Sequence, residues 1–250
     1  MIHLKTPEEI TIMQEGGKKL RTVVKGLLPK IRSGMTTNFI DIEAERLIRA
    51  QGAEPSFKRV PGYHWSTCMP INEQVVHTPP SSRILGEGDL VTLDIGVFYK
   101  GYHTDWATTV IIGRPLSNEH LHFLEVGKRA LRKAIQNATA GKCIGNMSEA
   151  IQQEIYSEGY YILKELTGHG IGRELHEDPY VPGHLDRPVE KTPHIKPGLV
   201  LAIEVIYSIG TENMSYEKDN EWSIVTQDGS LAACFEETVA IQQNNSFILT

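Results

Sequence analysis

In the first part of the 250-residue chain, hydrophobic and polar positions alternate with the period of an α-helix. Thr6-Pro7-Glu8-Glu9 combines an N-cap hydroxyl, a proline at the first helical position and a glutamate at the third. We predict a helix from there to about Leu28, since Pro29 follows. A second helix is predicted from Thr37 to just before Gly52, because apolar residues recur there on one face.

The pattern then becomes strand-like. Residues 66–76 and 89–112 are β-branched and apolar, with glycine and proline between the runs. Within the second run, segments 89–99 and 102–112 flank Lys100-Gly101, which predicts two antiparallel strands joined by a two-residue turn.

Helical periodicity returns in the second half of the chain. A helix is predicted at about 117–138 with Ser117 as its cap, and another at 147–158, where Asn146 and Glu149 resemble a capping box. Residues 160–248 have the pattern of strands and loops.

A spacing of 107 residues relates the two helical regions. Gly34 and Gly52 around the second predicted helix have counterparts at this spacing in Gly141 and Gly159. The order of helices followed by strands is thus used twice, and no linker-like tract separates the copies. We predict one domain over 1–250, built from halves of about 1–112 and 113–250 that share one sheet and a central cleft. The alternative is a coincidence between two ordinary amphipathic helices.

Composition narrows the class of protein. The chain is 40% apolar and 22% charged, which excludes a disordered or fibrous protein. Its net charge of −6 argues against nonspecific binding to nucleic acid or to an anionic membrane. Three scattered cysteines indicate a reducing compartment, and neither a signal peptide nor an 18-residue apolar run is visible. We expect a cytoplasmic protein.

Two aspartates occupy the predicted hairpin. Asp94 lies among apolar residues in the middle of one strand, and Asp105 lies on the next. A turn at 100–101 pairs residue 94 with 107, so we expect that a small bulge or register shift brings the two carboxylates side by side. Buried carboxylates repel one another unless a cation bridges them. The alternative is a surface hairpin with two solvated aspartates.

Three further phrases place ionisable residues in glycine-rich or apolar surroundings. His169 lies within Gly168-His169-Gly170-Ile171-Gly172, and His176-Glu177 follows it. Glu204 is the single charge in the apolar strand 201–206, and Glu236-Glu237 interrupts another apolar stretch. Neighbouring strand residues face opposite sides, so we expect one glutamate of this pair at the site and the other solvated or salt-bridged.

Two aspartates, one histidine and two glutamates form an oxygen-rich ligand set. Carboxylates can bridge two cations, as they do in hydrolytic two-metal sites, and this set suits Mn²⁺, Fe²⁺ or Co²⁺ at least as well as Zn²⁺. The number and spacing of the cysteines exclude a structural zinc site. The chain also contains no phosphate-binding loop, no nucleophile elbow and no His-Glu-x-x-His helix.

The order Asp94, Asp105, His169, Glu204, Glu236 resembles that of the type I methionine aminopeptidases. Four further phrases extend the likeness over essentially the whole chain: Lys5–Ile10, Ser66-Thr67-Cys68 with Ile71-Asn72-Glu73, His77 before prolines, and Gly172-Arg173 with His176-Glu177. The resemblance implies an α+β pita-bread fold, in which two pseudo-symmetric halves share a curved antiparallel sheet with helices on its outer face.

The resemblance also implies roles for the metal ligands. Asp94 would bind one of two divalent metal ions, which could be Co, Mn, Fe or Zn. Asp105 and Glu236 would bind both ions, whereas His169 and Glu204 would bind the second.

Catalytic and substrate-binding roles follow in the same way. Glu204 would also act as general base or acid towards the attacking water. His77 would contact the substrate near its amino end, and His176 would hydrogen-bond the scissile carbonyl. The walls of a methionine side-chain pocket would be Tyr63, Cys68 and Trp222, beside Leu175. The other seven histidines are expected at the surface or in loops: His3, His64, His103, His120, His122, His184 and His194.

The chain departs from the family pattern at Thr78, Gly96, Trp106, Leu175 and Glu237. None of these is a ligand, but Leu175 leaves the side-chain preference open. The expected function is removal of the initiator methionine from nascent chains by a monomer, with transient ribosome contact and no nucleic acid or membrane partner. The alternatives are an X-Pro aminopeptidase or prolidase, which usually carries an extra N-terminal domain, a paralogue with altered side-chain preference, and a non-catalytic binding protein.

Overall fold

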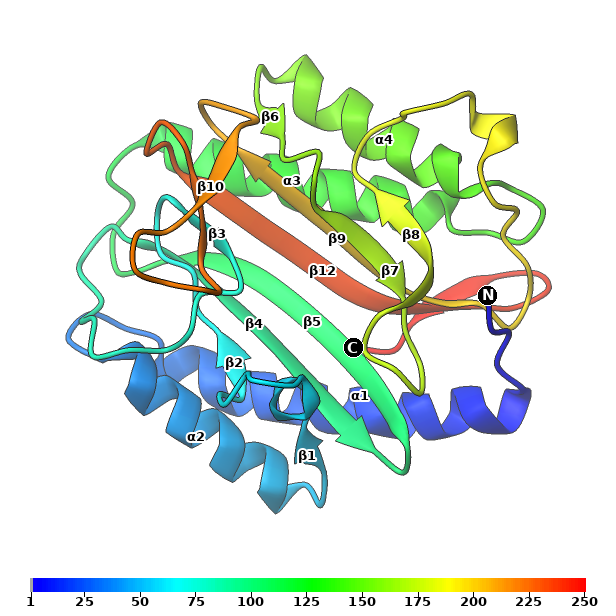
Figure 1. Cartoon of the computed structure of the whole chain (residues 1–250), viewed down its shortest axis with the longest axis horizontal. Helices are drawn as coiled ribbons and strands as arrows, with labels where there is room; N and C mark the ends of the chain where they lie inside the picture. The colour runs from blue at the N-terminus through cyan, green and yellow to red at the C-terminus, as the bar shows by residue number, and fades with distance from the viewer. Residues whose placement is uncertain (1) are drawn as a thin grey trace.

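A large antiparallel sheet runs through the centre of the computed structural model, which describes residues 2–250 (Figure 1). Its main path is β1 (Glu54–Pro55), β4 (Leu90–Tyr99), β5 (Tyr102–Ile111), β12 (Ala232–Ile241), β9 (Val200–Ser208), β7 (Thr167–Gly170) and β8 (Glu177–Pro182). Three short strands join it: β2 (Thr67–Cys68) beside β4, β6 (Tyr161–Ile162) beside β9 and β13 (Ser246–Ile248) beside β12. A separate sheet has the order β10 (Met214–Tyr216), β11 (Ile224–Thr226), β3 (Gln74–Val76).

Within residues 2–250, four α-helices form two pairs, and one helix of each pair packs against the long strands (Figure 1). Helix α1 (Pro7–Leu27) contacts β4 and β5 and carries α2 (Thr37–Ala50), whereas α3 (Asn118–Asn137) contacts β9 and β12 and carries α4 (Ile144–Ser157). Short 3-10 helices are η1 (Leu28–Lys30), η2 (Phe57–Arg59) and η3 (Val189–Lys191). The α+β class expected from the sequence is confirmed. No helix within residues 2–250 combines the length and apolar character needed to cross a membrane.

Side-chain alternation separates the helix-covered face of the sheet from the site-bearing face. Leu93 and Ile95 of β4 are fully buried in the core that includes α1 and α2, and Val205 of β9 is buried in the core that includes α3 and α4. Neighbouring residues of a strand point to opposite faces, so Asp94 and Glu204 lie on the other face. Burial of the apolar positions therefore fixes which way the carboxylates point.

The first three predicted helices are confirmed within a residue or two. Thr6 caps α1 through a complete capping box, in which Glu9 Oε2 accepts a hydrogen bond from the Thr6 N–H at 2.8 Å. Thr36 and Ser117 cap α2 and α3 through their hydroxyls alone, which accept from the N–H groups of Phe39 and His120.

The start of the fourth helix was predicted wrongly. Helix α4 begins at Ile144, with Cys143 as N-cap, and Asn146 accepts from the Cys143 N–H at 3.0 Å. The carbonyl of Pro193 and the hydroxyl of Thr192 accept the N–H groups of Ile144 and Gly145, each at 2.9 Å. A distant loop thus satisfies the first turn, which local sequence alone did not indicate.

The strand-like stretch 66–76 contains the short strands β2 and β3. One expectation about the following hairpin needs correction. The hairpin turn at Lys100-Gly101 is confirmed, with φ of 47° and 90°, but β4 and β5 pair without a bulge. Because Gly96 pairs with Asp105 and Asp94 lies two residues from Gly96, both aspartates already share one face. No register shift is needed.

The second helix of each pair reproduces the spacing noted in the sequence. Helices α2 and α4 have 14 residues each, and both bounds of α4 lie 107 residues after those of α2. Gly34 and Gly141 have φ of 84° and 90°, and Gly52 and Gly159 have φ of 68° and 78°. This equivalence supports the interpretation that the halves arose by duplication.

A close helix–sheet contact at Gly127 gives a stability prediction. A Cβ at this position of α3 would lie 2.6 Å from both a Phe235 ring carbon and the Tyr207 hydroxyl, which are buried. We expect Gly127→Ala to lower the free energy of unfolding by about 1–3 kcal/mol, because the core cannot accept the methyl without shifting. Chemical denaturation measures the change.

The matched control for this prediction is Gly26→Ala in α1. A Cβ there would meet only Leu47 at 3.5 Å, an ordinary contact, and Gly26 is exposed. We expect this variant to be stabilised by about 0.5–1 kcal/mol, since alanine favours helix more than glycine does. Equal effects of the two substitutions would contradict the packing argument.

Candidate metal centre and active site

Strand register aligns three carboxylates across the centre of the sheet. Asp94 of β4 pairs with Ala107 of β5, Ala107 pairs with Glu236 of β12, and Glu236 pairs with Glu204 of β9. The small side chain of Ala107 lies between Asp94 and Glu236 in this row. The site is therefore built on four long strands rather than on loops.

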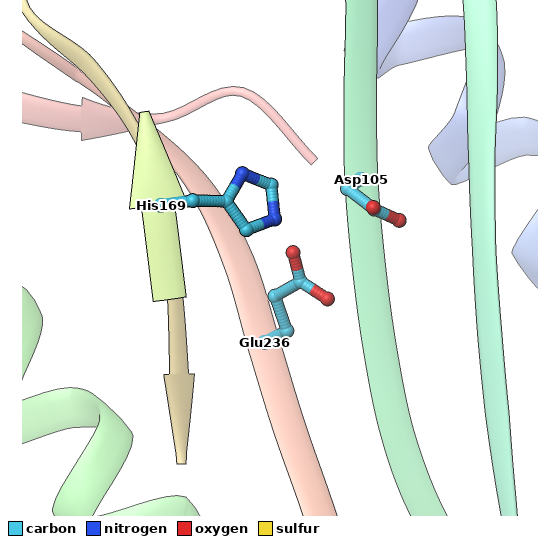
Figure 2. A group of neighbouring side chains, drawn as sticks. All are labelled: Asp105, His169 and Glu236. Carbon is cyan, nitrogen blue, oxygen red and sulfur yellow. The ribbon is translucent and has the colours of Figure 1, made fainter. Parts of the chain in front are cut away.

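Asp105 and His169 complete the group from neighbouring positions. Ligand atoms of Asp105, His169 and Glu236 all lie within 4.8 Å of one another, and these side chains come from β5, β7 and β12 (Figure 2). His169 Nε2 lies 3.3 Å from Glu204 Oε1. The five residues predicted as metal ligands thus meet at one place.

Burial makes this concentration of acidic groups unfavourable without a cation. Burial, reinforced by the charges of Asp105 and Glu204, raises the pKa of Asp94 well above its usual value. Burial also raises the pKa of Asp105 to about 7, with Glu204 contributing. For Glu236, burial and then Asp105 and Glu204 raise the pKa strongly. Positive charge at this point would reverse all three shifts.

Two of these carboxylates have an oxygen without a partner. Among the residues described, Asp94 Oδ1 and Glu236 Oε1 are buried and accept no hydrogen bond. Buried polar atoms are normally satisfied, so unpaired oxygens that share a cavity need a ligand. Carboxylate oxygens with a single imidazole are suitable donors for a hard or borderline divalent cation. The residues present therefore fit a metal.

The tautomer of His169 suits metal binding. Its Nδ1 lies 2.8 Å from the Gly170 carbonyl, which can only accept, so Nδ1 carries the proton and Nε2 faces the carboxylates. Burial lowers its pKa, but the hydrogen bond and charge of Glu204, the Gly170 carbonyl and Asp105 together raise it above the usual value.

Two further histidines line the same cavity. The His176 ring stacks edge-on against the His169 ring at 4.4 Å between centroids. Burial, and then the neighbouring histidines, lower the pKa of His176 to about 3, so it is neutral at pH 7. Burial also lowers the pKa of His77, whose φ of 57° is unusual for a residue with a side chain. Neutral imidazoles can donate one hydrogen bond each to a peptide carbonyl.

Aromatic residues and a thiol form the apolar wall of the cavity. Tyr63 and Trp222 pack edge-to-face at 5.1 Å between ring centroids. The Tyr63 hydroxyl donates to the Thr67 carbonyl at 2.8 Å and lies 3.1 Å from Cys68 Sγ. Leu175 is buried and also lines this cavity, which has a volume of about 140 Å³. The wall can contact an apolar side chain.

All ten predicted site residues line this cavity, namely Tyr63, Cys68, His77, Asp94, Asp105, His169, His176, Glu204, Trp222 and Glu236. Their individual roles remain predictions. Sequence reasoning missed Thr92 and Cys234, which also line it. Each lies two residues before a ligand on the same strand, so the period of two could have found them. Phe57 and Val76 come from short elements with no such signal.

Glu237 and His103 lie in surroundings that differ from those expected from the sequence. Glu237 is only partly exposed, and it forms no ion pair within residues 2–250. It faces the helix side, where Oε2 accepts from the Thr250 hydroxyl at 2.8 Å, and burial raises its pKa to about 7. His103 is not a surface histidine, since it is 4% exposed and its Nδ1 lies 2.6 Å from the Ser56 hydroxyl. Both lie on long central strands, where tertiary packing decides burial.

A buried acidic set with one imidazole at the centre of a pseudo-symmetric sheet defines a metal-dependent enzyme. Comparison with known proteins is more specific. The chain matches the model of metallopeptidase family M24 over residues 11–243, and it therefore belongs to that family. The family membership suggested by the residue order is confirmed, and so is the expectation of a hydrolase.

Relatives are similar over their whole length. Methionine aminopeptidase 1 of Bacillus subtilis is 41% identical over 250 residues, which cover 100% of this chain and 99% of that protein. The methionine aminopeptidase of Clostridium acetobutylicum is also 41% identical, over 251 residues, with the same coverage.

Solved structures agree on the fold. Methionine aminopeptidase from Thermotoga maritima matches with a TM-score of 0.95 at 34% identity, covering 100% of this chain and 99% of that one. Prolidase from Pyrococcus furiosus matches with a TM-score of 0.80 at 23% identity, but only 65% of its chain is covered, and this likeness concerns the fold alone. The expected pita-bread fold is confirmed.

Proposed function

We propose that this chain is a metallo-aminopeptidase that removes the N-terminal methionine from peptides and nascent proteins. The observation that carries the proposal is the row of carboxylates from Asp94 to Glu204, with His169 and His176 beside it in one apolar-walled cavity. Relatives that are methionine aminopeptidases support the choice of substrate.

The protein uses divalent metal, and we propose two ions at this centre. Asp94 would hold one ion, Asp105 and Glu236 would hold both, and His169 and Glu204 would hold the other. Mn²⁺, Fe²⁺, Co²⁺ and Zn²⁺ all suit this ligand set. Divalent cations at such a centre supply acidity to water, polarise a carbonyl and anchor a free amine.

Three side chains, those of Glu204, His176 and His77, would have the remaining roles in catalysis and substrate binding. Glu204 lies at the rim of the ligand group with its side chain 14% exposed, so it can accept the proton of the attacking water and pass it to the leaving amine. His176, neutral at pH 7, would donate to the scissile carbonyl oxygen as negative charge develops there. His77 would contact the substrate near its amino end.

Peptide cleavage tests the substrate class. We expect Met-Ala-Ser to be cleaved with a kcat/KM at least about 100-fold higher than Gly-Pro, because the cavity wall binds an apolar side chain. The measurement is product release with Mn²⁺ or Co²⁺ present. Leu-Ala-Ser serves as a control for side-chain preference beside Leu175. Hydrolysis of Gly-Pro alone would overturn the proposal in favour of an X-Pro peptidase.

The setting of this activity is also proposed. The substrates would be the N-termini of nascent chains in the cytoplasm, met during transient contact with the ribosome by a monomeric enzyme. Three free, buried cysteines suit a reducing compartment.

A further inference from the structure

A buried ion pair joins the N-terminal segment to the turn that carries His176. Lys5 Nζ lies 2.6 Å from Glu177 Oε2, and the two side chains are 4% and 8% exposed. Glu177 directly follows His176 and begins β8. A buried ion pair adds little net stability over apolar packing. This pair lies beside the site, so its main effect there is the geometry that it imposes.

Lys5 is itself anchored to the scaffold of the metal centre. Its backbone N–H donates to the Gly198 carbonyl at 2.6 Å, just before strand β9, which carries Glu204. A Cβ on Gly198 would lie 2.8 Å from the Lys5 carbonyl oxygen, so the two backbones are in close contact. The ammonium group therefore extends from a fixed point.

The lysine side chain lies directly against the turn 171–176. A Cβ at Gly172 would lie 2.5 Å from Lys5 Cε and 2.7 Å from Glu177 Oε1. The Gly172 carbonyl accepts from the His103 N–H at 2.7 Å, and Glu177 Oε1 accepts from the Glu174 N–H at 3.2 Å. Lys5 and Glu177 thus hold the turn from inside, while β5 holds it from the other side.

We propose that Lys5, acting through Glu177, is a positioning residue that sets where the His176 imidazole meets the scissile carbonyl. The backbone of His176 is adjacent to that of Glu177, and its ring rests against His169 at 4.4 Å between centroids. A shift of Glu177 would therefore move the imidazole along the cavity. The inference rests on the proposed function, since His176 needs placement only if a carbonyl binds there.

A second link between the same segments provides a matched control. Arg173 Nη2 lies 3.0 Å from Glu9 Oε1, but the Arg173 side chain is 72% exposed. Exposed pairs contribute little, and this one does not include Lys5 or Glu177. Arg173→Met therefore removes a cation between the N-terminal segment and the turn while Lys5 and Glu177 both remain.

The test compares steady-state constants on Met-Ala-Ser with Mn²⁺ present. We expect Lys5→Met to lower kcat by about 10- to 100-fold, because a small misplacement of a catalytic group has effects of that size. KM should change by less than about threefold, since ground-state binding rests on other residues. Arg173→Met should stay within about twofold of the unmodified protein in both constants.

A double variant separates positioning from general destabilisation. If Lys5 acts through His176, Lys5→Met changes kcat by less than about threefold once His176→Ala is present. Additive losses, or a folded Lys5→Met with unchanged kcat, would overturn the inference. Should Lys5→Met fail to fold, Glu177→Gln keeps the shape, removes the charge and carries the same expectations. An unmodified protein inactive on Met-Ala-Ser overturns the proposed function as well, whereas an active one with unaffected variants overturns only the inference.

Discussion

Replacement of Glu204 with glutamine is expected to lower kcat on Met-Ala-Ser by about 10²- to 10⁴-fold in a protein that remains folded. The amide keeps the size and one oxygen of the carboxylate but cannot accept the proton of water. Glu204 pairs with Glu236 across β9 and β12, and its removal leaves the strand pairing intact. Circular dichroism checks the fold, and elemental analysis checks that metal is still bound.

Glu237→Gln is the matched control on the neighbouring strand. Glu237 points to the helix side and binds the Thr250 hydroxyl, so glutamine can still accept that hydrogen bond. We expect kcat within about threefold of the unmodified value, as for a residue outside the reacting groups. Comparable losses in Glu204→Gln and Glu237→Gln would show that the wrong side of β12 has been assigned to the site.

Removal of divalent metal is expected to abolish peptidase activity and to make stability fall as pH rises. In the metal-free protein, burial raises the pKa of Asp105 from 3.8 to about 7. The folded state then holds a proton that the unfolded chain releases above about pH 4. The stabilisation is present below that pH and is lost as pH rises through 7, by about 4 kcal/mol for a shift of this size.

Calorimetry at several pH values tests this expectation. The difference in Tm between metal-loaded and chelator-treated protein should widen from pH 5.5 to 7.5, because bound cations stabilise the ionised carboxylates. The pKa of Glu237, also raised to about 7, affects both forms alike and cancels in the difference. A difference that stays constant with pH would contradict the assignment of Asp105. Metal content under saturating Mn²⁺ should reach about two ions per chain.

The hairpin around Lys100-Gly101 illustrates how far sequence reasoning reached. The turn and the pairing of residue 94 with 107 were predicted correctly because short-range geometry determines both. The bulge was unnecessary because residues diagonal across a strand pair already share a face. For α4 the reasoning failed, because Thr192 and Pro193 satisfy its first turn from almost 50 residues away in the chain, and no local pattern records that contact.

The burial of some polar residues could be predicted from the sequence, whereas that of others could not. Asp94 was expected to be buried because its neighbours are apolar. His103 lies in a polar stretch of the sequence. Its burial depends on two contacts with other elements: its Nδ1 lies against the Ser56 hydroxyl, and its N–H donates to the Gly172 carbonyl. The pairing of Lys5 with Glu177 joins residues 172 positions apart, so no spacing in the sequence could have predicted it.

The sequence by itself determined which residues are available and which face of each strand they occupy, because alternation and apolar burial are local properties. It also identified the family, since the order of five ligand residues along the chain is visible without knowledge of their contacts. Only the tertiary structure decided that β5 pairs with β12 and β9 with β7, which converts separate phrases into one metal centre. These pairings join strands far apart in the chain, so their register depends on tertiary packing rather than on any one segment.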